Sequence, residues 1–176
     1  MIFALLVFAS VIFFYNSNME NFLIIFAASY LYLFVVAATL AYFLALPRQI
    51  KKSFMLLAIV ALPTIYLCAQ IAAVFFFDPR PFVVGHFIPL IPHAPDNGFP
   101  SDHALLTSAI ASVVYPFSKK FSLILWLLAF AIGAARVMAG IHHFMDIFGA
   151  MAIAAVVTFV LNLSLKNQKF VAYLRS

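Results

Sequence analysis

Residues 121–165 read FSLILWLLAFAIGAARVMAGIHHFMDIFGAMAIAAVVTFVLNLSL. A helix needs about 20 mostly apolar residues to cross the hydrocarbon core of a bilayer, and this stretch is long enough for two such helices. The pair His142–His143 interrupts the apolar text and separates a helix at about 121–141 from a helix at 144–165. The stretch therefore predicts two membrane helices joined by a short polar turn.

The composition of the whole chain also indicates a membrane protein. Of its 176 residues, 67% are apolar and 9% are charged, whereas a soluble domain carries roughly 25% charged and about 45–50% apolar residues. A soluble fold of this length would have too little polar surface to face water, which argues against that class. The length suits one domain, residues 1–176. The chain begins without Lys or Arg, so we expect a retained membrane helix rather than a secretory signal peptide.

Four more apolar runs precede the opening stretch. The run 21–46 ends at Pro47, and the run 53–77 carries Pro63, a kink that a membrane bundle tolerates. The predicted fold class is all-α: a polytopic membrane protein with six transmembrane helices in one bundle. The six expected helices are 2–15, 21–46, 53–77, 101–117, 121–141 and 144–165.

A long polar loop, residues 78–100, connects the third and fourth of these helices. It contains or ends on six prolines, and so many prolines predict that no regular helix forms there. Long loops in compact proteins are often functional, so the loop is a candidate part of a site.

Charged residues separate between the two sides of the expected bundle. One side receives eight of the ten basic residues, and the positive-inside rule makes that side, with both termini, cytoplasmic. Those residues are Arg48, Lys51, Lys52, Lys119, Lys120, Lys166, Lys169 and Arg175. The other side holds Arg80, Arg136, all five acidic residues and all five histidines. The net charge of +5 is thus explained by topology rather than by a nucleic-acid partner, and we expect a polar site at the non-cytoplasmic mouth.

Three residues on that side suit an anion. The guanidinium groups of Arg80 and Arg136 match phosphate oxygens in geometry and charge. Ser101 follows Pro100 and suits the N-cap of the fourth helix, whose free N–H groups favour a phosphate. Taken singly, each arginine could instead cap a helix C-terminus, and Ser101 could be no more than a cap.

Two histidines on the same side suit catalysis. His142 and Asp146 are four residues apart, which places them on one face of a continuous helix. A carboxylate on one imidazole nitrogen leaves the other nitrogen free to attack, and His103 could be the general acid that protonates a leaving oxygen. Singly, His142 could be an interfacial histidine and Asp146 could balance an arginine. We interpret His86, His93 and His143 as loop or interfacial residues.

In order and spacing, three segments resemble the signature of the type 2 phosphatidic acid phosphatase superfamily. That signature is Lys-x6-Arg-Pro, then Pro-Ser-Gly-His, then Ser-Arg-x5-His-x3-Asp. The matching residues are Arg80, Pro81, Pro100, Ser101, His103, Arg136, His142 and Asp146. The chain departs from the signature at three positions, where it has Ala73 for lysine, Asp102 for glycine and Ala135 for serine.

The resemblance implies a helical, metal-independent lipid phosphatase that needs no cofactor. His142 would attack phosphorus and form a phosphohistidine, Asp146 would orient it, and His103 would protonate the leaving group and then activate water. Three residues would hold the phosphate oxygens, namely Arg80, Ser101 and Arg136, with Asp102 as a possible supporting residue. The missing lysine also admits a weakened or inactive homologue.

The segment Phe99-Pro100-Ser101-Asp102-His103 resembles one branch in particular, the bacitracin-resistance type of undecaprenyl-diphosphate phosphatase. This resemblance implies that the substrate is the C55 isoprenyl diphosphate left by cell-wall polymer synthesis. The products would be the monophosphate carrier and inorganic phosphate. The expected location is the bacterial cytoplasmic (inner) membrane, with the site facing the periplasmic or extracellular side.

Other functions remain open from the sequence. The same chemistry could act on phosphatidylglycerol phosphate, phosphatidic acid or lipid A. A histidine-rich metal transporter is a different class, because His103, His142, His143 and Asp146 are possible ligands; two arginines beside a cation would disfavour it. A purely structural membrane subunit would tolerate changes at His142.

Overall fold

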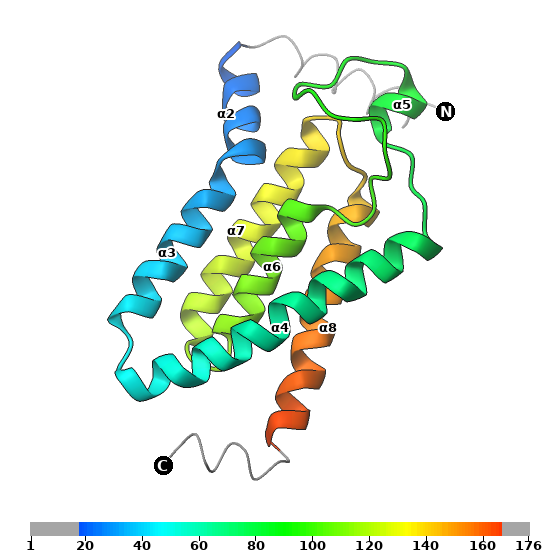
Figure 1. The fold of residues 1–176 in the computed structure, drawn as a ribbon. Helices are drawn as coiled ribbons and strands as arrows, with labels where there is room; N and C mark the ends of the chain where they lie inside the picture. Colours follow the sequence, from blue (N-terminus) through cyan, green and yellow to red (C-terminus); the bar gives the residue numbers. More distant parts are fainter. Residues whose placement is uncertain (1–17, 167–176) are drawn as a thin grey trace.

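The computed structural model describes residues 18–166, and this part of the chain is helical, without a β-strand (Figure 1). The helices are α2 (Asn18–Ser29), α3 (Leu31–Ala45), α4 (Arg48–Phe75), α5 (Pro81–Gly85), α6 (Asp102–Val114), α7 (Lys119–Met138) and α8 (Phe144–Lys166). The predicted all-α class is confirmed for these residues. The first expected helix, 2–15, lies outside the described residues.

Several helices are suited to a bilayer. By length and composition α4, α7 and α8 can each cross a membrane, and α2 with α3 makes a fourth span if the bent pair counts as one. Helix α6 is apolar but has only 13 residues. Large apolar side chains such as Phe34, Leu67 and Phe159 are exposed on the outside of the bundle, as lipid contact requires. The chain is thus a multi-pass membrane protein, while six spans stay a prediction.

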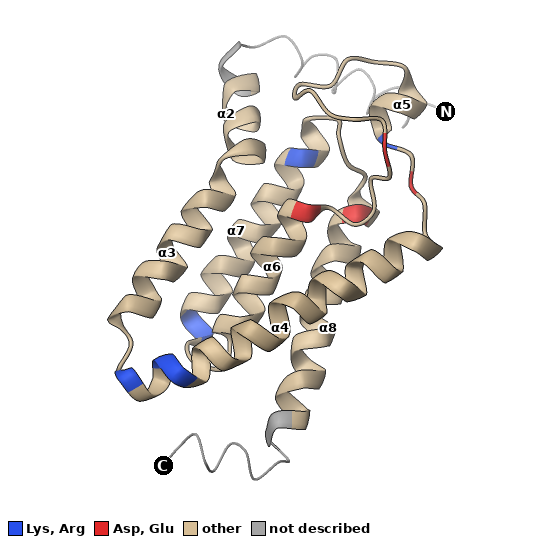
Figure 2. Cartoon of the chain, viewed as in Figure 1, with Lys and Arg blue, Asp and Glu red and all other residues tan. Residues whose placement is uncertain are grey.

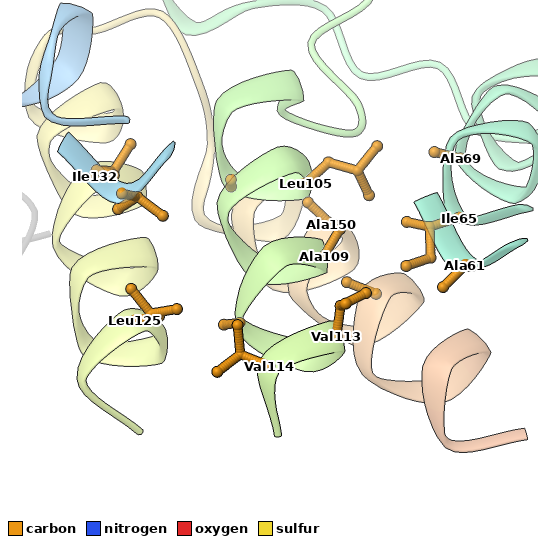
Figure 3. Close-up of a cluster of buried hydrophobic side chains, with 14 of the residues drawn as sticks. Ala61, Ile65, Ala69, Leu105, Ala109, Val113, Val114, Leu125, Ile132 and Ala150 are labelled. Carbon is orange, nitrogen blue, oxygen red and sulfur yellow. The ribbon is translucent and has the colours of Figure 1, made fainter. Parts of the chain in front are cut away.

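Helix α6 lies at the centre of the bundle and contacts α3, α4, α7 and α8. Small side chains fill much of its length and let neighbouring helices approach closely. Leu105 and Val113 of α6 pack in one apolar cluster with Ile65 of α4 and with Leu125 and Ile132 of α7 (Figure 3). This packing fixes the N-terminal end of α6, where the Pro-Ser-Asp-His segment begins, between α7 and α8.

Most expected helix boundaries are within a few residues of the observed ones. The largest difference is at α4, which begins at Arg48 because Pro47 occupies its N-cap. Proline suits a helix start, where its missing N–H costs nothing, so the helix includes the basic segment 48–52. Helix α7 ends at Met138, three residues before the expected end.

The expectation of one unbroken helix over 21–46 was wrong. The chain bends by 45° between α2 and α3, at Tyr30. Arg136 Nη1 of α7 donates a hydrogen bond to the Ala28 carbonyl oxygen at 3.1 Å. In a regular helix that carbonyl would accept from the backbone four residues later, and a side chain inserted into this ladder is a known cause of a kink. We attribute the bend to this contact.

The loop 78–100 also differs from expectation, because it contains the short helix α5. Pro81 is the first residue of α5, the position at which proline is well tolerated in a helix. The remainder of the loop is irregular and covers one end of the bundle (Figure 1).

The two ends of the bundle differ in charge (Figure 2). Basic residues gather at the start of α4 and at the start of α7, at one end. The described acidic residues lie at the opposite end, which the loop 78–100 covers. Arg80, at the start of α5, and Arg136, in the last turn of α7, belong to the same end. The separation of charge inferred from the sequence is therefore present among the described residues, and Lys169 and Arg175 lie outside them.

Candidate active site

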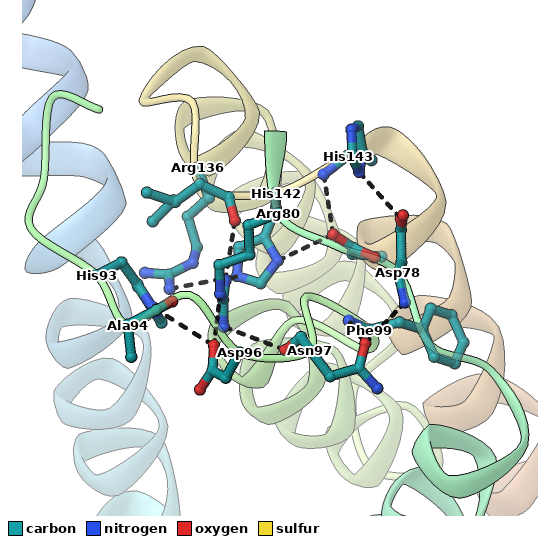
Figure 4. Close-up of polar contacts among 12 residues, drawn as sticks. Asp78, Arg80, His93, Ala94, Asp96, Asn97, Phe99, Arg136, His142 and His143 are labelled. Atoms are coloured by element: carbon teal, nitrogen blue, oxygen red, sulfur yellow. Dashed lines mark hydrogen bonds and ion pairs between the residues drawn. The ribbon is translucent and has the colours of Figure 1, made fainter. Parts of the chain in front are cut away.

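Three polar segments meet at the end of the bundle that the loop covers. They are the segment from Asp78 to Arg80, the N-terminal turn of α6, and the turn between α7 and α8 (Figure 4). Ser101 N–H donates to the Asp146 carbonyl oxygen at 3.3 Å, which ties the start of α6 to the start of α8. Leu90 N–H donates to the Ala139 carbonyl oxygen at 3.0 Å and ties the loop to the same turn.

His142 lies in this turn, between α7 and α8. It is not on a continuous helix with Asp146, as the spacing had suggested, because α7 ends at Met138 and α8 begins at Phe144. The turn includes Gly140, whose φ of +78° favours glycine. The two side chains still meet: His142 Nδ1 lies 3.1 Å from Asp146 Oδ2, and both residues are buried.

The two nitrogens of the His142 ring have opposite surroundings. Nε2 lies 3.3 Å from Arg80 Nη1 and 3.4 Å from Arg136 Nη2. A guanidinium group can only donate, so Nε2 must be the unprotonated acceptor and Nδ1 must carry the hydrogen that it donates to Asp146. This tautomer leaves a lone pair directed toward the two arginines.

The electrostatic surroundings of His142 favour a neutral ring. Burial lowers the pKa of His142 from its ordinary value. The hydrogen bond to Asp146 acts against this shift, and the charges of Arg136 and Arg80 add to it. At neutral pH the ring is therefore uncharged, as a nucleophile requires.

Arg80 is held by several acceptors. Its Nε donates to Asp96 Oδ1 at 2.7 Å, Nη1 to the Ile141 carbonyl oxygen at 2.9 Å, and Nη2 to the Asn97 carbonyl oxygen at 3.3 Å. The side chain of Arg80 is buried, whereas that of Asp96 is 60% exposed. Burial acts to raise the pKa of Asp96, but the hydrogen bond and the charge of Arg80 lower it below its ordinary value.

Two hydrogen-bond donors in the site have no partner among the described residues. The Nε of Arg136 is buried without an acceptor, although Nη1 and Nη2 of the same side chain are engaged. Ser101 occupies the N-cap position of α6, but its hydroxyl makes no capping bond and is also buried without a partner. The expected N-cap position of Ser101 is therefore confirmed, although its hydroxyl makes no bond to the helix. Buried unpaired groups are costly, and a bound anion would supply acceptors for both.

The other two residues of the Pro-Ser-Asp-His segment point in different directions. Asp102 is exposed in the first turn of α6. His103 is half-buried and packs edge-on against Tyr32 of α3, with 4.7 Å between ring centroids. It lies within electrostatic range of Arg136 and His142. The structure thus places five of the predicted site residues and His103 in one region, with Asp102 at its exposed edge.

Asn97 was not singled out from the sequence. Its Oδ1 accepts from the Asp78 N–H at 2.9 Å and from the Phe99 N–H at 3.0 Å, and its Nδ2 donates to the carbonyls of Ala73 and Phe76. The contact to Phe99, two residues on, is a turn that asparagine favours. The Pro-Asp-Asn-Gly text at 95–98 is the signal that could have indicated it.

A second carboxylate–imidazole pair lies beside the first. His143 Nδ1 lies 3.0 Å from Asp78 Oδ2, and the ligand atoms of Asp78, His143 and Asp146 lie within 4.8 Å of one another. Burial raises the pKa of Asp78, and the neighbouring Asp146 carboxylate raises it further. Such a set could hold a divalent cation. However, Asp146 Oδ2 already accepts from the His143 N–H at 2.9 Å and faces His142, and two buried guanidinium groups would repel a cation.

The part of the chain that forms the site is also the part that resembles known proteins. Residues 53–170 match the sequence profile of the PAP2 superfamily. The Bacitracin transport permease protein BcrC of Bacillus licheniformis is 30% identical over 132 residues, 74% of this chain and 64% of that protein. The Undecaprenyl-diphosphatase BcrC of Bacillus subtilis (strain 168) is 34% identical over 85 residues, 48% of this chain and 44% of that protein. The matched part therefore spans less than two thirds of either relative.

Two crystal structures share the fold. LpxE of Aquifex aeolicus superposes with a TM-score of 0.67 and 23% identity, covering 82% of this chain and 86% of that one. A PAP2-type phosphatidylglycerolphosphate phosphatase of Bacillus subtilis superposes with a TM-score of 0.57 and 20% identity, covering 88% and 81%. At these identities the likeness establishes the fold alone.

Proposed function

The chain belongs to the PAP2 superfamily, and from this premise we propose that it is a membrane phosphatase that hydrolyses undecaprenyl diphosphate. The observation that carries the proposal is the His142 ring, with Nδ1 on Asp146 and Nε2 between two buried arginines. An anion that accepted from those arginines in place of Nε2 would leave the Nε2 lone pair available for attack. This arrangement suits attack on a phosphorus atom.

The first half of the reaction transfers a phosphoryl group to His142. Nε2 forms a bond to the terminal phosphorus while the bond from that phosphorus to the bridging oxygen breaks. His103, whose protonated form the negative charge of the bound diphosphate would favour, gives its proton to the bridging oxygen, so that the lipid leaves as a monophosphate. The His142 ring becomes positive when it is phosphorylated, and the Asp146 carboxylate stabilises that charge through Nδ1–H.

The second half returns the enzyme to its starting state. His103, now neutral, takes a proton from water as the water oxygen attacks phosphorus, and the bond from phosphorus to Nε2 breaks. The products are inorganic phosphate and neutral His142. In both halves Arg80, Arg136 and the Ser101 hydroxyl would donate to the phosphate oxygens, where negative charge is concentrated in the transition state.

The lipid is inferred from the sequence relatives. One relative is named an undecaprenyl-diphosphatase, and Asp102 of the Pro-Ser-Asp-His segment is the variant expected for that branch. Hydrolysis of a glycerolipid phosphate, as in the name of one structural neighbour, would use the same His142 chemistry. Phosphate release from each lipid, measured as described below, decides between these substrates.

The orientation of the site follows from charge. Basic residues occupy the end of the bundle opposite the site (Figure 2), and basic segments prefer the cytoplasmic side of a bacterial membrane. We therefore propose that the site opens to the periplasmic or extracellular side. A lipid diphosphate released there would reach the site without crossing the membrane.

Phosphate release by the purified protein in detergent tests the proposal. Undecaprenyl diphosphate, phosphatidylglycerol phosphate and phosphatidic acid are compared with EDTA present, because the proposed chemistry needs no metal ion. Preference for the diphosphate is expected, with loss of turnover in His142→Ala and retention in His86→Asn, an exposed loop control. Preference for a glycerolipid would retain the mechanism and reject the substrate. Full activity of folded His142→Ala would reject the nucleophile.

A further inference from the structure

His93 lies against the proposed nucleophile and has no role in the mechanism above. The rings of His93 and His142 meet edge to face, with 6.2 Å between their centroids and 73° between their planes. The side chain of His93 is 26% exposed, so it borders the site without being sealed inside it. In Figure 4 it lies beside Arg136, while Asp78 and His143 lie beyond the other side of the His142 ring.

One carboxylate joins His93 to the arginine pair. Asp96 Oδ1 accepts from Arg80 Nε at 2.7 Å and lies 4.0 Å from His93 Nδ1. The same oxygen therefore faces both a guanidinium and an imidazole. This contact positions His93 relative to Arg80 and would stabilise a positive charge on its ring.

The charge of His93 depends on what occupies the site. Burial lowers the pKa of His93, and the charges of Arg80 and Arg136 lower it further, while Asp96 acts in the opposite direction. The remaining titratable neighbours are His142 and His103. In the empty site, the two arginines thus disfavour a third positive charge. A bound anion that neutralises them removes this penalty and favours the imidazolium.

The site has two buried arginines to receive its substrate, and a diphosphate ester carries more negative charge than a monophosphate. The chain has Ala73 where the superfamily signature has a lysine. The carbonyl of Ala73 accepts from Asn97 Nδ2 at 3.2 Å, so the segment next to Asp96 packs onto the end of α4 at this position. His93 lies in the same loop as Asn97. With no lysine at position 73, His93 is a further side chain that can supply positive charge at the edge of the site.

We propose that His93 is a specificity-determining residue that binds, as an imidazolium, the phosphate group that leaves with the lipid. This inference rests on the proposed function. The terminal phosphate would occupy the space between Nε2 of His142 and the two arginines, and the second phosphate would lie beyond it, toward the exposed edge where His93 lies. His93 makes no covalent bond in this role. It favours a diphosphate because a monophosphate has no second phosphate group for it to contact.

Kinetics with farnesyl diphosphate and farnesyl monophosphate test this role, since the two substrates share one lipid and differ by one phosphate. We expect His93→Gln to lower kcat/KM for the diphosphate roughly 10- to 100-fold, the usual worth of a hydrogen bond to a charged group. The value for the monophosphate should change by less than about threefold, which is near the lower end of hydrogen-bond energies. His86→Asn is the matched control, because His86 is an exposed histidine of the same loop with a left-handed backbone that asparagine also adopts.

A binding measurement tests the role of His93 without requiring turnover. Inorganic pyrophosphate and inorganic phosphate are compared as competitive inhibitors or by direct calorimetry, and His93→Gln should weaken pyrophosphate binding more than phosphate binding. An equal loss for both substrates and both anions, or no loss for either, would overturn the role of His93. If the wild-type protein hydrolyses neither undecaprenyl diphosphate nor a farnesyl substrate, the proposed function fails, and the binding comparison still decides whether His93 recognises the second phosphate.

Discussion

At the scale of a single residue, the two nitrogens of His142 divide the site into two electrostatic halves. The Nδ1 side faces the Asp146 carboxylate, and the Nε2 side faces Arg80 and Arg136. The carboxylate makes the ring a better nucleophile, and the arginines lower its pKa and attract the anion that it attacks. The same ring is thereby kept neutral and directed at its target.

A pH profile tests whether the arginines act on His142. Burial and the two arginines lower the pKa of His142, and the nucleophile must be neutral, so kcat/KM should rise with pH through that lowered pKa. It should fall again at higher pH, where the general acid His103 loses its proton. Arg80→Gln removes one charge that lowers the pKa, so the acid limb should move to higher pH, together with a loss of activity. A limb that stays in place or moves to lower pH would contradict this assignment.

Asp146→Asn tests the other half of the site. Without the carboxylate, the tautomer with Nδ1–H loses its acceptor and the phosphorylated ring loses its counter-charge. We expect kcat to fall by roughly 10²–10⁴-fold, the range observed when the orienting or acid–base partner of a catalytic histidine is removed. Circular dichroism and thermal unfolding in detergent would establish that the variant is folded. Activity within a few-fold of wild type would show that Asp146 does not assist His142.

The sequence indicated the main site residues because their spacing is local or repeats a known signature. Arg80, Ser101, Arg136, His142 and Asp146 come together as expected, although their chemical roles remain proposals. Asp96 and Asn97 were not singled out as site residues, because their positions depend on the path of an irregular loop, which hydrophobic patterns do not specify. For the same reason His93 was interpreted only as a loop or interfacial residue. The N-cap position of Ser101 was predicted correctly, but the sequence does not reveal that its hydroxyl makes no capping bond.

At the scale of the helices, apolar runs and prolines predicted most boundaries, and the bend between α2 and α3 was the main failure. Nothing within residues 21–46 predicts it, since this run contains no proline or glycine. We attribute the bend to a hydrogen bond from Arg136, which is 108 residues away in the chain from the Ala28 carbonyl. The sequence pattern within one helix cannot predict a contact with a residue so far away in the chain.

The crossing of α7 and α8 provides a prediction at this scale. A Cβ atom on Gly133 of α7 would overlap with Ile147 Cγ2 of α8, because the two carbon atoms would be closer than their van der Waals radii allow. Gly133→Ala should therefore destabilise the fold by about 1–3 kcal/mol, as overpacking usually does. Adding Ile147→Leu removes the β-branch that carries Cγ2 and should restore part of the loss. Equal melting temperatures for wild type and Gly133→Ala in detergent would disprove the close contact.

At the scale of the whole molecule, the two ends of the bundle differ in charge, and the loop 78–100 covers only the end with the site (Figure 2). The apolar cluster around α6 connects them, and the basic residues lie at the end away from the site (Figures 2 and 3). The expected direction of the molecule in the membrane follows from this separation rather than from any one residue.

Cysteine labelling in cells tests this direction. Lys52→Cys and His86→Cys are introduced singly into a Cys68→Ala background, since Cys68 is the chain's only cysteine. A membrane-impermeant maleimide should label position 86 in intact cells and position 52 only after the membrane is opened. The reverse pattern would place the site on the cytoplasmic side.

The direction of the His142 ring also has a consequence for the isomer of the covalent intermediate. Because Nδ1 is occupied by Asp146 and Nε2 faces the anion-binding arginines, the phosphoryl group can be accepted only on the nitrogen remote from the backbone. A trapped intermediate should be the tele isomer of phosphohistidine, not the pros isomer. Each turnover would also invert phosphorus twice, so a chiral thiophosphate substrate should yield a product of retained configuration.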